Sequence, residues 1–182
     1  MKLVTVTPPR AYPVTLDQAR TQCRVLDESH DEELLRLVQA ATASVEVYLG
    51  ARIMEQTVRL ELGCFPDSAL SIDLGVYPVT SVDSLTYIDT AGDEQTLVEG
   101  TDYWTDGSGQ YPTLAPVDSW PETQEGRPAA VNITMTAGWE DPTAVPADIA
   151  QAILLAVGYN FDNSQDKPDS TYLLSPHRRL VL

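Results

Sequence analysis

Apolar residues recur at helical spacing between positions 31 and 50. They are separated by four, three, four and three positions, which places them on one face of a helix: Leu34, Val38, Ala41, Val45 and Tyr48. Asp31, Glu32 and Glu33 fall in the first turn, where the helix dipole favours anions, and Ser29 is expected to cap it in a second capping box. Gly50 suits the position just past the end.

Two further helices are predicted. Thr15 and Gln18 have the spacing of a capping box, so a short helix should begin there with Leu16, Ala19 and Cys23 on its inner face. The third begins at Pro146 and is apolar nearly all round, so it should be buried in a helical core or between subunits.

Between these helices the period of the pattern changes from about 3.6 to two. Alternating apolar residues predict half-buried antiparallel strands near positions 58–62, 70–74 and 131–136, and residues 85–89 and 94–98 flank a turn-rich link typical of a hairpin. Residues 102–127 are dense in Gly, Pro, Asp and Ser and are interpreted as a long irregular loop.

The predicted fold class is therefore α+β. A helical bundle frame, made of two N-terminal helices and one long C-terminal helix, carries an inserted antiparallel β region and an extended C-terminal tail. We expect residues 1–52 to form the N-terminal helical part of the core, 53–145 the β insertion, 146–161 the C-terminal core helix, and 162–182 a flexible link and tail.

Charge is unevenly distributed along the chain. The formal net charge is −16, and between Ile53 and Val145 only Arg59 and Arg127 are basic, against 16 acidic residues. Tight binding to nucleic acid is excluded by this balance, because affinity for phosphates rests on Lys and Arg. The acidic segment is either an ordinary solvated β surface or a wall that repels DNA and lets it slide past.

The sequence offers little support for catalysis or for a cofactor. Nucleotide-binding and zinc-protease motifs are absent, and the two histidines, His30 and His177, have no nucleophile or carboxylate at a motif spacing. Asp102 and Asp106 could offer oxygens to Ca²⁺, but turn chemistry is the better interpretation of their Gly- and Ser-rich surroundings. We expect no enzyme activity, no cofactor and no metal.

The remaining composition bounds the compartment. Cys23 and Cys64 have no metal-like spacing and are expected to be free thiols in a reducing compartment. No apolar run reaches the length of a membrane span, so we expect a soluble protein that is made inside the cell and has no membrane partner.

The order of several short motifs resembles tailed-phage head-tail connector (adaptor) proteins, a family that includes adaptors of gene transfer agents. The resemblance begins with Pro13–Arg20, Asp31–Leu35 and Tyr48–Gly50. It continues in the same order through Thr57–Leu60, Phe65–Pro66, Tyr77–Val79, Thr136–Trp139, Ile149–Leu155 and Leu173–Arg178. It covers nearly the whole chain, departing at His177, where the family often has an aromatic residue, and over 102–127.

The resemblance implies a structural virion protein. Such a protein forms a ring, expected to be dodecameric, beneath the portal, joins the capsid to the tail, and lets double-stranded DNA pass without tight binding. Its partners would be further copies of itself, the portal protein, and a tail terminator or a stopper (nozzle) protein. Its location would be the virion neck, after synthesis in the host cytoplasm.

Two sets of residues are candidates for these contacts. The basic-apolar tail is a candidate portal-binding segment that is mobile in the free protein and orders on its partner, through Leu173, Leu174, Pro176, His177, Arg178, Arg179, Leu180 and Val181. The alternative is that it packs back on its own helical core. Trp104, Tyr111 and Trp120 are candidate lateral contacts in the ring, although aromatic residues in loops more often pin the loop to a sheet.

Two other functions fit some of these features. An acidic inhibitor that mimics DNA would share the negative charge, and binding to nucleases or restriction enzymes would identify it. A carbohydrate-binding or carbohydrate-active β protein of the tail would use the three aromatic residues with nearby carboxylates, and a glycan-binding assay would identify it.

Overall fold

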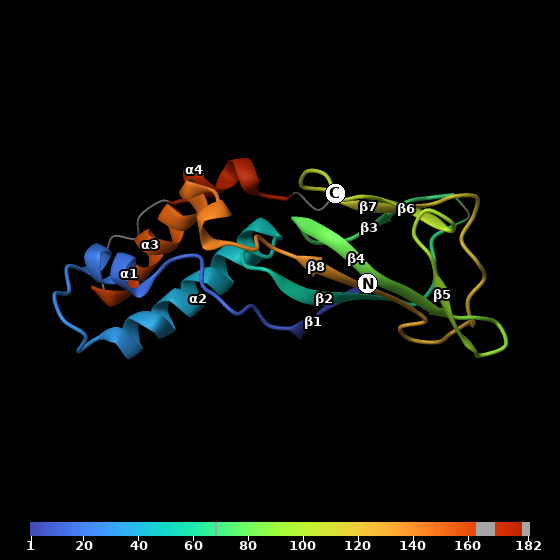
Figure 1. Ribbon diagram of the computed structural model, residues 1–182, viewed down its shortest axis with the longest axis horizontal. Helices are drawn as coiled ribbons and strands as arrows, with labels where there is room; N and C mark the ends of the chain where they lie inside the picture. Colours follow the sequence, from blue (N-terminus) through green and yellow to red (C-terminus); the bar gives the residue numbers. More distant parts are fainter. Residues whose placement is uncertain (68, 163–169, 180–182) are drawn as a thin grey trace. The chain divides into compact units, whose positions relative to one another are not determined.

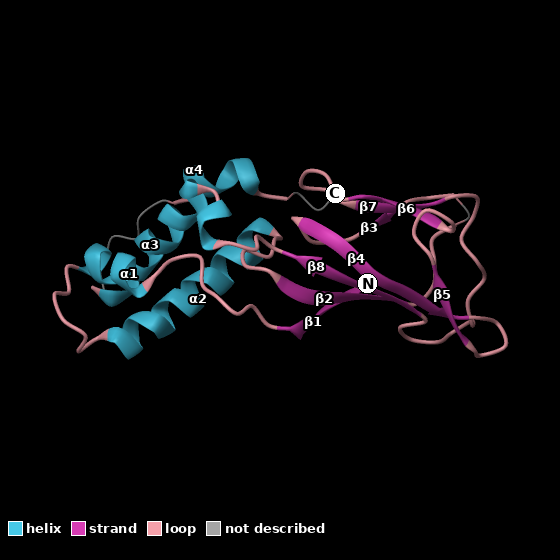
Figure 2. Cartoon of the chain, viewed as in Figure 1, coloured by secondary structure: helices cyan, strands magenta, loops and turns pink. Residues whose placement is uncertain are grey.

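The computed structural model describes residues 1–67, 69–162 and 170–179, which form two compact units. One unit, called here the β unit, contains Met1–Pro9 and Glu55–Gly138. The other, the helical unit, is built from Arg10–Met54 and from the described residues that begin with Trp139. The mixed α+β composition with antiparallel sheets agrees with the predicted fold class (Figure 1, Figure 2).

The β unit contains two sheets. The larger has the order β1-β2-β8-β4-β5, with antiparallel neighbours throughout, and is built from β1 (Lys2–Thr7), β2 (Gln56–Leu62), β8 (Val131–Ala137), β4 (Val79–Ile88) and β5 (Glu94–Leu97). The smaller has the order β3-β7-β6 and is built from β3 (Ile72–Asp73), β7 (Thr113–Pro116) and β6 (Tyr103–Asp106).

Alternation of apolar residues produces the core of this unit. Every second side chain along β8 is fully buried, as are Val58 and Leu60 in the middle of β2, whereas Leu62 is partly buried. These residues join one hydrophobic cluster with Leu114 of β7 and Tyr103 of β6: Val58, Leu60, Val131, Ile133, Met135 and Ala137. The predicted strands at 58–62 and 131–136 and the hairpin of β4 and β5 are confirmed. The strand predicted at 70–74 is short, and Leu70 is 62% exposed.

The helical unit contains α1 (Leu16–Cys23), α2 (Asp31–Leu49) and α3 (Ala147–Phe161), with α3 packed against both of the others. Two 3-10 turns, η1 (Pro142–Ala144) and η2 (Ser175–His177), and the short helix α4 (Thr171–Leu174) complete its described elements. Its largest fully buried side chains come from α2, α3 and the segment between α2 and β2: Leu34, Val38, Leu49, Ile53, Ile149 and Ile153.

The ends of the first two helices test the predicted caps. At α1 the capping box is present, since the Thr15 hydroxyl accepts from the Gln18 amide at 3.2 Å and the Gln18 side chain accepts from the Thr15 amide at 2.8 Å. Gly50 ends α2 in the left-handed conformation with φ +67°. The second predicted capping box is wrong, because the N-cap of α2 is His30 and the Ser29 hydroxyl donates to Asp27 instead.

Three assignments differ from those expected, and the first is that Trp139–Val145, expected in the β insertion, belong to the helical unit. Residues 1–9 belong to the β unit, where β1 pairs with β2 across more than 50 positions of sequence, rather than to the helical core. Residues 102–127 are not wholly irregular, because they hold β6 and β7. Strands of four residues show only two alternations, which is too few to identify them, and Pro116 within β7 weakens the signal further.

Candidate interaction surfaces

The described C-terminal residues pack on the helical unit. Residues 171–179, which we name the C-terminal clasp, comprise α4, η2, Arg178 and Arg179. Leu174 is 5% exposed and Arg179 is 8% exposed, whereas Tyr172 is 67% exposed. α4 lies against α3 (Figure 1). One side of the clasp therefore belongs to the core and the other faces outward.

A hydrogen bond ties the end of the clasp to α2. The Arg179 amide donates to the Leu49 carbonyl at 2.9 Å. Carbonyls in the last turn of a helix have no partner within the helix, so this bond satisfies one of them. Gly50 follows at once, and a Cβ placed there would lie 3.4 Å from the Arg179 Cβ, which shows how closely the two backbones approach.

Two side chains of the clasp make charged contacts. The His177 Nε2 lies 2.6 Å from the Asp148 Oδ2, in the first turn of α3, while the other Asp148 oxygen accepts from the Ile149 amide at 3.0 Å. The Arg178 guanidinium lies 5.0 Å from the centre of the Tyr48 ring, within the range of a cation–π contact. The clasp thus connects α2 with α3.

These contacts correct the expectation of a tail detached from the core. Five of the eight candidate residues are held against the helical unit through Leu174, His177, Arg178, Arg179 and the part-buried Leu173, and Pro176 is exposed. Leu180, Val181 and most of the predicted link at 162–171 lie outside the described residues. Polar and charged contacts with α2 and α3 hold the clasp on the helical unit, although few of its side chains are apolar.

The three aromatic candidates differ in exposure. Trp104 is 58% exposed and Tyr111 is 47% exposed, whereas Trp120 is 7% exposed. The Trp120 ring stacks on Phe65 with centroids 4.9 Å apart, and its Nε1 donates to the Leu70 carbonyl at 2.8 Å. Trp120 therefore pins its loop within the β unit, and only Trp104 and Tyr111 face solvent.

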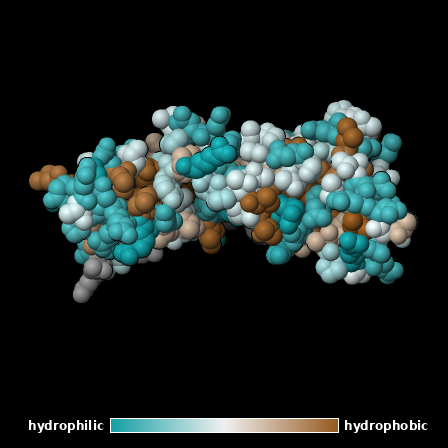
Figure 3. Space-filling model, turned by 60° about the horizontal axis from the view of Figure 1, so that its bottom comes forward, coloured by the Kyte–Doolittle hydropathy of each residue, from teal (hydrophilic) through white to brown (hydrophobic). Residues whose placement is uncertain are grey.

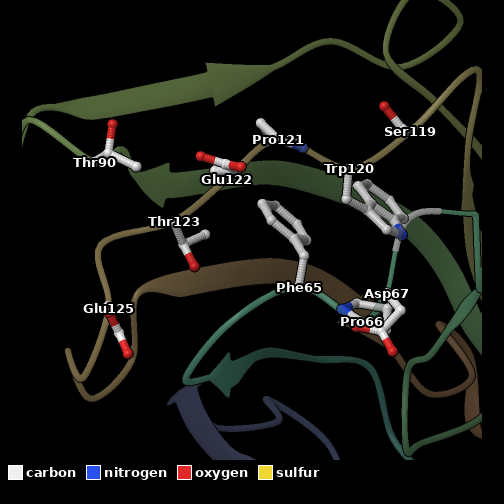
Figure 4. Close-up of a pocket in the computed structure, with 10 residues that line it drawn as sticks. All are labelled: Phe65, Pro66, Asp67, Thr90, Ser119, Trp120, Pro121, Glu122, Thr123 and Glu125. Atoms are coloured by element: carbon white, nitrogen blue, oxygen red, sulfur yellow. The ribbon is translucent and has the colours of Figure 1, made fainter.

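A groove of about 740 Å³ lies beside this stack. Figure 4 shows Phe65 and Trp120 near its centre, with the carboxylates of Asp67, Glu122 and Glu125 around them. Neither ring offers an open face of the kind that binds a sugar, because both side chains are at least 92% buried. No group of three or more potential ligands for a metal ion is found among the residues that the structure describes.

Several acidic residues of the chain organise turns. Asp89 accepts from the Gln95 side chain at 2.8 Å and from the Ala91 and Asp93 amides at 2.9 and 3.0 Å, and these bonds hold its pKa below the ordinary value. Asp106 accepts from Ser108 in the same way, which also lowers its pKa. The interpretation of Asp106 as a turn residue is confirmed.

Exposed hydrophobic residues do not form one continuous area on the face drawn in Figure 3, where they occur as separate groups among hydrophilic ones. The most exposed in the helical unit are Leu26, Val47 and Tyr172, and in the β unit Met1, Leu70 and Trp104.

Within the described ranges, no helix is both long enough and apolar enough to cross a membrane. The two cysteines are free thiols, as expected.

Residues 13–74, which run from the segment before α1 to the end of β3, match the model of the phage gp6-like head-tail connector protein family. The predicted resemblance to head-tail connectors is confirmed. No curated protein sequence matches the chain.

Three solved structures share the fold over the whole chain. A chain in the neck of an empty gene transfer agent (GTA) particle, computed with C6 symmetry, has a TM-score of 0.83 and 23% identity. A chain from the virion of a native GTA particle has a TM-score of 0.82 and 24% identity, and one from the neck of a native GTA particle, computed with C12 symmetry, has 0.80 and 22%. Each alignment covers 100% of this chain and 97% of the other.

The sequence did not predict which residues of α2 and α3 contact the clasp. Tyr48 is predicted to lie on the buried face of α2, and no contact with the tail is predicted for Asp148 or for the Leu49 carbonyl. Neither Tyr48 nor Asp148 lies near the tail in sequence, so no spacing connects them. The only usable signal was that a helix C-terminus needs donors and attracts cations, which Arg178 and Arg179 supply.

Proposed function

We propose that this protein is a structural connector of the virion neck, which forms a ring beneath the portal and joins the head of a phage or gene transfer agent particle to its tail. The observation that carries the proposal is the shared fold, over 100% of this chain, with a chain in the neck of a GTA particle. The connector-family match over residues 13–74 supports the same role independently.

A closed ring requires heterologous contacts, in which one surface of a copy meets a different surface of the next. Symmetries of six and twelve were used for the necks that contain the similar chains, and a ring of twelve copies is compatible with both. We propose twelve copies for this chain, with Trp104 and Tyr111 as candidate lateral contacts because both are exposed. The role is structural rather than enzymatic.

The proposed partners are the portal protein on one side and a tail terminator or a stopper protein on the other. The clasp is the proposed portal-binding element, because it brings exposed apolar and cationic groups together at one end of the helical unit. Leu180 and Val181, which lie outside the described residues, stay part of that proposal.

The β unit is proposed to face the DNA conduit or the tail. It carries 14 acidic and three basic residues, so its charge repels a DNA duplex. At physiological ionic strength screening sets in over about 8 Å, which leaves the repulsion effective only at short range. Retardation of duplex DNA by the purified protein at moderate salt, weakening steeply as salt rises, would contradict this assignment.

Electron microscopy of the purified protein mixed with its cognate portal ring tests the proposal. We expect a ring of added density at one end of the portal. Persistent failure to bind the portal would remove the proposed function, and inhibition of a nuclease or restriction enzyme by the isolated protein would point to the DNA-mimic alternative.

A further inference from the structure

Some side chains of the clasp are buried against the helical unit, and others are exposed to solvent. Leu174 and Arg179 point into the helical unit, at 5% and 8% exposure, whereas Tyr172 and Arg178 lie on its exposed side. Tyr and Arg are among the residue types that most often dominate binding energy at protein interfaces. The exposed side thus has the composition of a binding surface, and the buried side has the composition of a support.

Arg178 is held in place before any partner arrives. Its guanidinium lies over the Tyr48 ring at 5.0 Å, and its backbone is fixed on both sides, by η2 before it and by the bond from Arg179 to Leu49 after it. Arg178 is exposed, so a partner can reach its guanidinium, and no ion pair with it is found among the described residues. A guanidinium ordered in this way loses less entropy when it binds a carboxylate.

Release of the clasp would break several of these interactions together. The buried Leu174 side chain, the bond to the Leu49 carbonyl, the His177–Asp148 pair and the Arg178–Tyr48 contact would all be lost. A last-turn carbonyl of α2 would also lose its donor. A partner that bound an unfolded tail would have to replace each of these contacts. A partner that binds the exposed side of the folded clasp leaves them intact.

We propose that the clasp stays folded on the helical unit when the protein docks, and that its partner places carboxylates against Arg178 where it lies over Tyr48, with the exposed Tyr172 as a further contact. This inference rests on the proposed function, in which that partner is the portal ring. It replaces the expectation of a mobile arm with a preformed site, whose recognition chemistry is a carboxylate on a stacked guanidinium.

The first test measures binding of full-length variants to the purified portal ring over a range of salt concentrations. We expect Arg178→Ala to weaken binding at least tenfold and to flatten its salt dependence, Arg178→Lys to fall between, and Tyr48→Ala to weaken binding as well. Arg36→Ala, which removes an exposed arginine on α2, outside the clasp, is the matched control and should leave binding unchanged. Thermal unfolding of each variant checks that the fold is retained.

The second test asks whether the clasp opens. Gly50→Cys with Arg179→Cys, in a chain whose own cysteines are replaced by Cys23→Ala and Cys64→Ser, places two Cβ atoms about 3.4 Å apart, close to the spacing of a disulfide. We expect the oxidised, locked protein to bind the portal as well as its reduced form does. Should the double variant not fold, hydrogen exchange of the Arg179 amide in the wild-type chain provides the same answer, because its protection should persist in the complex.

The outcomes separate the two levels of the proposal. If the wild-type chain binds the portal but Arg178→Ala binds equally well, or if locking abolishes binding that reduction restores, the folded-clasp inference is overturned while the proposed function stands. If the wild-type chain does not bind the portal, the proposed function fails and the inference fails with it.

Discussion

Replacement of Trp120 distinguishes a role inside the β unit from a role in ring contacts. The side chain is 7% exposed, stacks on Phe65 with the ring planes 1° apart, and donates to the Leu70 carbonyl. Trp120→Ala removes the stack, opens a cavity and leaves the carbonyl without its donor, and it should therefore lower the free energy of unfolding by about 3 to 5 kcal/mol. Trp120→Phe keeps an aromatic ring against Phe65 and loses the hydrogen bond, so about 1 to 2 kcal/mol is expected.

The assay is urea unfolding followed by far-ultraviolet circular dichroism, with Trp104→Ala as the matched control. Trp104 is 58% exposed, so its replacement should change the free energy of unfolding by no more than about 0.5 kcal/mol. A loss below about 1 kcal/mol for Trp120→Ala would refute the assignment of this residue to the core. If that variant no longer assembles into a ring but is as stable as the wild-type chain, Trp120 takes part in the lateral contacts of the ring.

Three further outcomes are expected. Gly50→Ala should cost about 1 kcal/mol or more in thermal unfolding, because φ is +67° and the clasp backbone lies close, whereas Gly63→Ala, with open space around it, should have little effect. Asp89→Asn should lower the free energy of unfolding at neutral pH, and this loss should shrink as the pH falls below about 4. Hydrogen bonds, first from Gln95, lower the pKa of Asp89 in the folded protein. The stability that Asp89 contributes is therefore present above the ordinary pKa of 3.8 and is lost as the pH falls through the lowered pKa. A thiol reagent at pH 8 should label exposed Cys64 at least tenfold faster than Cys23, whose pKa is raised by burial and by the charge of Asp162; equal rates would contradict the packing of α1.

Sequence patterns predicted the elements that are specified by residues close together in the chain. The capping box at Thr15, the glycine at position 50 and the alternation along β8 each specify structure within a few residues, and each is found as expected. The buried face of α2 is also found, except that Leu49 is buried and Tyr48 is only part-buried. The family resemblance also rests on short motifs in order, and the match over residues 13–74 falls on that part of the chain.

The sequence by itself therefore determined the helices, the longer strands, the acidic character of the β region and the resemblance to head-tail connectors. Only the tertiary structure decided that residues 1–9 close one edge of the larger sheet, that Trp120 is a core residue, and that the clasp lies on α2 and α3. Each of these depends on partners that are distant in the sequence, such as Leu49 and Asp148 for the clasp. The period of the apolar pattern predicts which face of a segment is buried. It does not predict which distant group will pair with a given donor, acceptor or charge.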